Sequence, residues 1–255
     1  SLNFVLHQNG DSLRISDIDL KTPASKAAGD VLLVSGEPLS FAGQLTLQAG
    51  FSDFMFLDIR PPDPAFTPVI HLQASGHPDS ALLSLSAEYE QQSLHINGLI
   101  SPDFSSDYNI DAVFEQLRIG DWSPALADLH ALSGRLQLQG IGVHPDTLNA
   151  EARLQLHAPG WDHYRLDTLN AIASLTPASG RVRIRGGGPP GRLDAAISLG
   201  RPFTGAPFDA VLRVEHADPG AALQDGLHSD ISGELRADGQ LGYLNQLFVD
   251  SSVRI

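Results

Sequence analysis

The chain has 255 residues, 42% of them hydrophobic and 18% charged, which predicts a folded protein and not a disordered tail or a membrane bundle. Thirty acidic against sixteen basic residues give a net charge of −14, which argues against nucleic acid as a partner. The absence of cysteine excludes a disulfide framework and thiolate chemistry, and is compatible with a cell-envelope protein.

Alternation of apolar and polar residues dominates the chain and predicts strands with one buried face. The clearest runs lie between turn residues in about sixteen segments, among them 83–89, 108–114, 148–158, 193–199 and 208–214. Continuous apolar clusters such as Phe54 to Leu57 are only strand length, so no segment is predicted to cross a membrane as a helix. The sequence therefore predicts an all-β protein.

The alternation slips by one residue at several points, as between Ile15 and Ile18 and between Leu166 and Leu169. A slip would turn the apolar set to the other face, so each marks a β-bulge or a turn between short strands. Bulges bend and twist a sheet. We therefore expect a long, strongly curved, mostly antiparallel sheet, like a half-pipe or taco, with an apolar concave face.

One or two short helices are expected beside the strands. Asp121 with Pro124, and Asp218 with Pro219, each offer a cap and a proline at the first helical turn before spaced leucines. Each segment then runs into Ser-Gly and a strand. This recurrence predicts weak repeat units at about 108–158 and 208–255, with Leu117 set against Leu212.

The whole of 1–255 is interpreted as a single elongated β-repeat region, an internal fragment of a longer chain. The first residue is Ser1, and the last strand segment, from Leu247, has nothing after it to cover it.

No motif predicts catalysis, a cofactor or a metal site. Gly186 to Gly191 matches G-x-G-x-x-G, but its two prolines lack the N–H donors of a phosphate loop and no helix follows, so we expect a loop between strands. The ten histidines, such as His71 and His157, lack zinc spacings and occupy polar strand positions. The cluster from Trp161 to Tyr164 could serve a glycan-active enzyme, but aromatic capping of a core is the commoner explanation.

The apolar face itself is the candidate site, because a sheet with one apolar side must cover that side or use it. Strict alternation selects the lining residues of a lipid-binding groove: Leu136, Leu138, Leu148, Leu154, Leu156, Leu193, Ile197, Phe208 and Leu212. The alternative is a β-sandwich or β-solenoid interaction domain in which these residues form a closed core.

The segments Tyr108 to Ile119, Leu132 to Gly142 and Pro145 to Leu156 resemble repeats of the AsmA-like and TamB families of bacterial envelope proteins, clearest from about Asp107 to Gly239. The shared pattern is a strand, a leucine-bearing linker, an L-x-G-x-L-x-L-x-G turn and strand, and a further alternating strand.

The resemblance implies a periplasmic segment of a protein anchored in the inner membrane of a Gram-negative bacterium. It implies phospholipid acyl chains as the ligand, transport between the inner and outer membranes, and support of outer-membrane biogenesis with a barrel partner contacted by the full-length parent. No enzymatic activity is implied.

Overall fold

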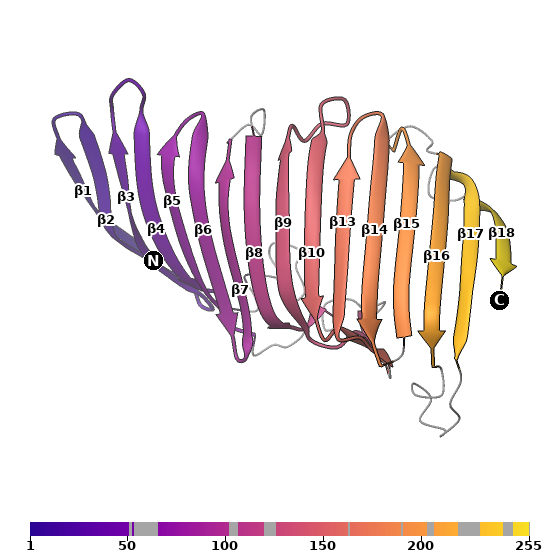
Figure 1. Ribbon diagram of the computed structural model, residues 1–255. Helices are drawn as coiled ribbons and strands as arrows, with labels where there is room; N and C mark the ends of the chain where they lie inside the picture. The colour runs from indigo at the N-terminus through magenta and orange to yellow at the C-terminus, as the bar shows by residue number, and fades with distance from the viewer. Residues whose placement is uncertain are drawn as a thin grey trace. The chain divides into compact units, whose positions relative to one another are not determined.

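The computed structural model describes residues 1–50, 53, 66–101, 107–119, 126–162, 164–189, 191–202, 207–218, 230–241 and 247–254, with the backbone alone from residue 241 onward. Almost all of the described residues in regular structure are in strands (Figure 1).

The strands are eight to eleven residues long, apart from two short ones. They are β1 (Leu2–Asn9), β2 (Ser12–Lys21), β3 (Lys26–Val34), β4 (Ser40–Gln48), β5 (Val69–His77), β6 (Ser80–Tyr89), β7 (Gln92–Ile100), β8 (Asp107–Leu117), β9 (Leu132–Ile141), β10 (Asn149–His157), β11 (Gly160–Trp161), β12 (Tyr164–Arg165), β13 (Thr168–Leu175), β14 (Ser179–Gly188), β15 (Gly191–Gly200), β16 (Pro207–Ala217), β17 (Ile231–Leu241) and β18 (Leu247–Arg254).

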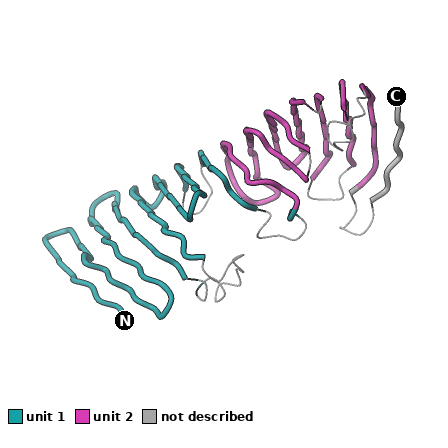
Figure 2. The backbone as a smooth tube through the Cα atoms, turned by 90° about the horizontal axis from the view of Figure 1, so that it is seen from below, with its two compact units in different colours: residues 1–127 teal, residues 128–255 magenta. Residues whose placement is uncertain are grey.

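The chain divides into two compact units, residues 1–127 and 128–255, which Figure 2 colours separately. Strand order follows chain order from β1 to β18, with β11 and β12 apart as a two-stranded sheet. In unit 1 each strand from β1 to β8 pairs antiparallel with the next. In unit 2 the same holds from β9 through β10, β13 and on to β18.

The predicted all-β, antiparallel fold class is confirmed, and the sheet is open. Each described pairing of the large sheet joins strands that follow one another along the chain, except that β11 and β12 lie between β10 and β13. Strands bend along their length, most visibly β7, β8 and β9 (Figure 1). The interpretation of the chain as a single repeat region made of weak repeat units stays a prediction.

Both predicted slips in the alternation are real breaks in strand pairing. The β2–β3 register shifts between Ile15 and Ile18, and Asp17 at the shift has a φ of 55°. At Leu166 the chain turns between β12 and β13. The first slip is therefore a bulge and the second is a turn.

Both predicted helices fall mainly outside the described residues. Of the first, Leu126 lies in a 3₁₀ turn, Leu129 forms a lone bridge with Trp161, and Leu132 is already the first residue of β9. Of the second, only Asp218 is described, in no regular structure.

The two predicted repeat units begin with the same arrangement of strands. Both begin with an eleven-residue strand, β8 and β16, whose next-to-last residue has a positive φ, 52° at Gln116 and 53° at His216. Each strand is followed by a connection and then by β9 or β17. By its place in the strand Gln116 corresponds to His216, and the match of Leu117 with Leu212 stays a prediction from the sequence.

The backbone at Asp17 makes a first testable prediction. A β-branched side chain at a left-handed φ costs about 1–2 kcal/mol, so Asp17→Val should lower the free energy of unfolding by roughly that amount, whereas Asp17→Gly should not. Asp19→Val is the matched control, because Asp19 is paired with Ala28 in ordinary strand geometry. Urea unfolding checks this; equal stability of the Val and Gly variants at position 17 would contradict the bulge.

Candidate apolar binding face

Strand register in unit 2 puts apolar residues opposite apolar residues on β9, β10 and each strand from β13 to β17. Leu136 lies opposite Leu154, Leu154 opposite Ala171, and Ala171 opposite Ile184. Residues directly opposite each other on antiparallel strands project from the same side of a sheet. These positions therefore form one continuous surface, which we call the apolar face of unit 2.

Every position of this face is Gly, Ala, Val, Leu, Ile or Phe. Its residues are Gly134, Leu136, Leu138, Gly140, Ala150, Ala152, Leu154, Leu156, Leu169, Ala171, Ala173, Leu175, Gly180, Val182, Ile184, Gly186, Leu193, Ala195, Ile197, Leu199, Phe208, Ala210, Leu212, Val214, Gly233, Leu235, Ala237 and Gly239.

The structure brings together eight of the nine residues that alternation selected as groove lining. They are Leu136, Leu138, Leu154, Leu156, Leu193, Ile197, Phe208 and Leu212. The ninth, Leu148, lies in the turn before β10, where its N–H donates to the carbonyl of His144 at 2.8 Å, so strand pairing does not assign it to this face.

Most large side chains on this face are half-buried, and Leu235 is exposed at 36%. Leu136, Leu138, Leu154, Leu193, Ile197, Phe208 and Leu212 all fall between buried and exposed, and Leu156 is the most buried of the eight at 9%. Among the described residues, no large side chain anywhere is less than 2% exposed. A dense second layer would have buried these leucines completely, so the described residues do not form the closed core of a sandwich.

Unit 1 has an equivalent face, which the sequence-based selection missed. Leu13 lies opposite Leu33, Leu45 opposite Leu72, and Ile96 opposite Ala112. The face consists of Leu13, Ile15, Ile18, Leu20, Ala27, Gly29, Val31, Leu33, Phe41, Gly43, Leu45, Leu47, Ile70, Leu72, Ala74, Gly76, Ala81, Leu83, Leu85, Ala87, Leu94, Ile96, Gly98, Ile100, Ile110, Ala112 and Phe114. The same alternation in 41–47 and 70–76 was the signal that could have found it.

One end of the apolar face in unit 2 is covered by Leu166 and Asp167, which follow β12. A Cβ atom on Gly186 would lie 2.9 Å from Cδ1 of Leu166, and one on Gly188 would lie 2.7 Å from the backbone nitrogen of Asp167. The Asp167 N–H donates to the Gly187 carbonyl at 2.8 Å, which fixes these two residues there. Glycine on β14 therefore makes room for this cover.

One end of the apolar face in unit 1 is covered as well. Phe66, 8% exposed, meets Tyr89 edge-on with ring centroids 4.5 Å apart. Buried Ser25 accepts a hydrogen bond at 2.8 Å from the N–H of Gly50. Unit 1 thus has buried contacts at the ends of its strands, and Ala112 and Phe114 on β8 are buried as well.

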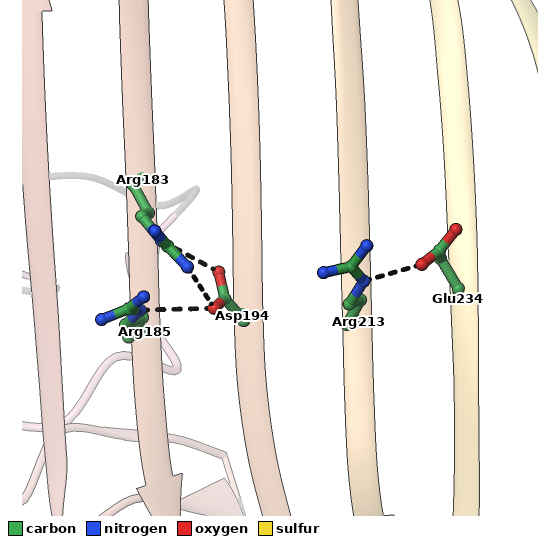
Figure 3. Close-up of polar contacts among 5 residues, drawn as sticks. All are labelled: Arg183, Arg185, Asp194, Arg213 and Glu234. Atoms are coloured by element: carbon green, nitrogen blue, oxygen red, sulfur yellow. Dashed lines mark hydrogen bonds and ion pairs between the residues drawn. The ribbon is translucent and has the colours of Figure 1, made fainter.

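The opposite side of unit 2, its polar face, carries a ladder of charges on successive strands (Figure 3). Asp194 on β15 accepts from Arg183 Nη2 at 2.8 Å and from Arg185 Nε at 3.3 Å, both on β14. Glu234 on β17 accepts from Arg213 Nε on β16 at 2.7 Å. Opposite charges that face each other across neighbouring strands favour this register over a shifted one.

These pairs shift the protonation of their carboxyl groups. The hydrogen bond from Arg183 holds the pKa of Asp194 below its usual value, and Arg185 adds to the effect. The hydrogen bond from Arg213, and then that from Arg236, does the same to the pKa of Glu234. Both acids are therefore charged near neutral pH, as a water-facing surface requires.

The chemical motifs found in the sequence do not converge on a reactive centre. Trp161 and Tyr164 face each other across β11 and β12 and are 43% and 47% exposed, while His163 lies outside the described residues. Gly188 pairs with Gly191, so the glycine-rich segment is a hairpin between strands, as predicted. Within the described part of the chain, no three His, Asp or Glu side chains gather as a metal site.

The fold and this surface define a class of protein: an open antiparallel β-sheet protein whose units each have one apolar and one polar face. Compared with protein families, with curated proteins and with solved structures, the chain matches none. Among the described residues, no helix is long and apolar enough to span a bilayer.

The cover over Gly186 and Gly188 leads to a paired prediction. Gly188→Ala should destabilise the protein by about 1–3 kcal/mol, because the new methyl group meets fixed backbone at Asp167. Gly186→Ala should change stability by less than about 0.5 kcal/mol, because only the end of the Leu166 side chain has to move. Urea unfolding compares the two variants. An equal loss of unfolding free energy in both would show that Leu166 and Asp167 do not cover β14.

The arginine pair on Asp194 predicts a pH dependence. A carboxyl whose pKa is lowered on folding stabilises the fold above its unfolded pKa of about 3.9, and this stability is lost as the pH falls through the folded pKa. Wild type should therefore exceed Asp194→Asn in stability at pH 7, by less than about 1 kcal/mol because the pair is solvent-exposed, and the difference should vanish in acid. Urea unfolding from pH 7 to pH 2 measures it; a difference independent of pH would refute the ion pair.

Proposed function

We propose that this chain is a non-enzymatic periplasmic segment of an AsmA/TamB-like protein whose apolar faces shield lipid acyl chains. The observation that carries the proposal is the in-register apolar face of each unit, on which most large side chains stay half-buried. The sequence resemblance supplies the setting: an inner-membrane-anchored parent that moves phospholipid between the two membranes and contributes to outer-membrane biogenesis, with a barrel protein as a partner of the full-length parent.

The chemistry of the proposed function is desolvation alone. Burying a methylene group recovers about 0.8 kcal/mol, so a fatty chain gains several kcal/mol on a face of Leu, Ile, Val and Phe. Because every position of the face is apolar, an acyl chain that moves along the face stays in contact with apolar groups throughout. A chain held in this way binds and also slides.

Alternating small and large residues suit such a ligand. The row through Gly140, Ala150, Leu175 and Gly180 changes size from strand to strand. The polar face, with its paired charges, keeps the other side of the same strands in water. A headgroup stays at the margin of the face, where water is available, and no pocket for a particular headgroup is required.

A single charge in the middle of the face tests the proposal. Leu154→Asp should keep its strand signal in circular dichroism and its cooperative unfolding, yet bind fatty acid several-fold more weakly, because a carboxylate resists burial against an acyl chain. Gln155→Asp is the matched control, since it adds the same charge to the next residue on the polar face. Native mass spectrometry and titration with a fluorescent fatty acid give the readout.

The outcomes separate the lipid surface from the closed-core alternative. Unfolding of Leu154→Asp, with Gln155→Asp intact, would favour a β-sandwich or solenoid core, because an unpaired buried charge is severely destabilising. A wild-type chain that carries no phospholipid after purification and binds no fatty acid would rule out the lipid function for these units.

A further inference from the structure

The polar face of unit 1 differs from that of unit 2 in one respect: the central strands of unit 1 carry almost no charged residues on this face. Residues 1–127 contain sixteen of the chain's thirty acidic residues. Yet on β4, β5, β6 and β7, all fully described, Glu88 is the only Asp, Glu, Lys or Arg among the polar-face positions. These are Ser40, Ala42, Gln44, Thr46, Gln48, Val69, His71, Gln73, Ser75, His77, Ser80, Leu82, Ser84, Ser86, Glu88, Ser93, His95, Asn97 and Leu99. We call this surface the uncharged panel.

An uncharged exposed sheet surface is unusual in a protein of this charge. Exposed strands normally carry Lys, Glu, Asp or Arg, which keep the protein soluble and prevent sheets from associating. Unit 2 follows that pattern, with Arg183, Asp194, Arg213 and Glu234 on consecutive strands. The panel instead exposes amides, hydroxyls and aliphatic groups, so its composition calls for an explanation other than solubility.

An open hollow of about 740 Å³ extends over this panel and onto Arg14 of β2 and Asp30 and Leu32 of β3. Its lining includes an in-register row of hydrogen-bonding groups, in which Gln44 lies opposite Gln73, Gln73 opposite Ser84, and Ser84 opposite Asn97. The adjacent row on the same strands carries Ala42, Ser75 and Leu82. A polar row thus runs beside a largely aliphatic row, and Leu82 is 60% exposed.

The polar row is available to a ligand. Gln44 donates from Nε2 to Asp30 at 2.6 Å, which orients its amide and leaves its carbonyl oxygen as an acceptor. Within the described residues, the side chains of Gln73, Ser84 and Asn97 have no hydrogen-bond partner in the protein. Amides and hydroxyls both donate and accept, and strands place them about 4.8 Å apart.

We propose that the hollow of the uncharged panel binds a neutral oligosaccharide that lies across β4 to β7. A sugar ring presents hydroxyl groups at its edge and C–H groups on its face. The amide row pairs with the hydroxyls, and Leu82 with its neighbours contacts the C–H groups. The lack of charge on the panel suits a neutral ligand, because removing an amide from water costs less free energy than removing an ion. Arg14 and Asp30 supply charge only at the β2–β3 margin of the hollow.

Isothermal titration of the full chain with maltoheptaose, cellohexaose and chitohexaose tests the proposal, with polygalacturonate as the charged comparison. At least one neutral probe should bind, and Gln73→Ala combined with Asn97→Ala should weaken that binding tenfold or more. Leu82→Glu should also weaken it, because it introduces charge into the aliphatic row.

Gln137→Ala is the matched control, since it removes an exposed amide from the polar face of unit 2 and should leave affinity unchanged. Circular dichroism of each variant verifies folding. Absence of binding by every neutral probe at millimolar concentration, a preference for polygalacturonate, or binding unaffected by the Gln73/Asn97 double variant in a folded protein would each overturn the proposal. Lipid binding by the apolar faces is unaffected by any of these outcomes.

Discussion

Backbone hydrogen bonding between consecutive antiparallel strands fixes which side chains share a face. In unit 2, Leu154 lies opposite both Leu136 and Ala171. A shift of one residue would set it opposite Arg135 or Gln137 on β9, or opposite Asn170 or Ile172 on β13, and would turn its side chain to the other face. The charge ladder on the other side, from Arg185 to Asp194 and from Arg213 to Glu234, favours the same register. The two faces thus specify each other, and both candidate sites follow from that one constraint.

The sequence predicted those features of the fold that depend on the local alternation of apolar and polar residues. Period-two alternation identified most strands, and the slip between Ile15 and Ile18 located the bulge at Asp17. It also chose eight residues that strand pairing brings onto one face. These predictions succeeded because almost every strand of the large sheet pairs with the next strand along the chain, so that the alternation of each strand determines the face of the sheet.

What the sequence could not supply depends on register and on contacts between distant residues. The apolar face of unit 1 was not among the predicted lining residues, because alternation alone does not show which strands pair in register to form one surface. Leu148 continues the alternation of β10 but lies in the turn before it. The cover of Gly186 by Leu166 and the hollow beside Gln44 and Gln73 required knowledge of which residues meet across strands. Neither the cover nor the hollow could be predicted from the periodicity of the sequence.

The absence of cysteine allows the central claim, that the apolar faces are accessible to acyl chains, to be measured residue by residue. Single cysteines introduced from Arg153 to Leu156 and from Ala196 to Leu199 can each carry an environment-sensitive fluorophore. The account predicts that added fatty acid shifts emission to the blue at Leu154, Leu156, Ile197 and Leu199, and leaves their polar-face neighbours unchanged. A uniform response along the strands, or positions 154 and 197 that cannot be labelled in the folded protein, would contradict it.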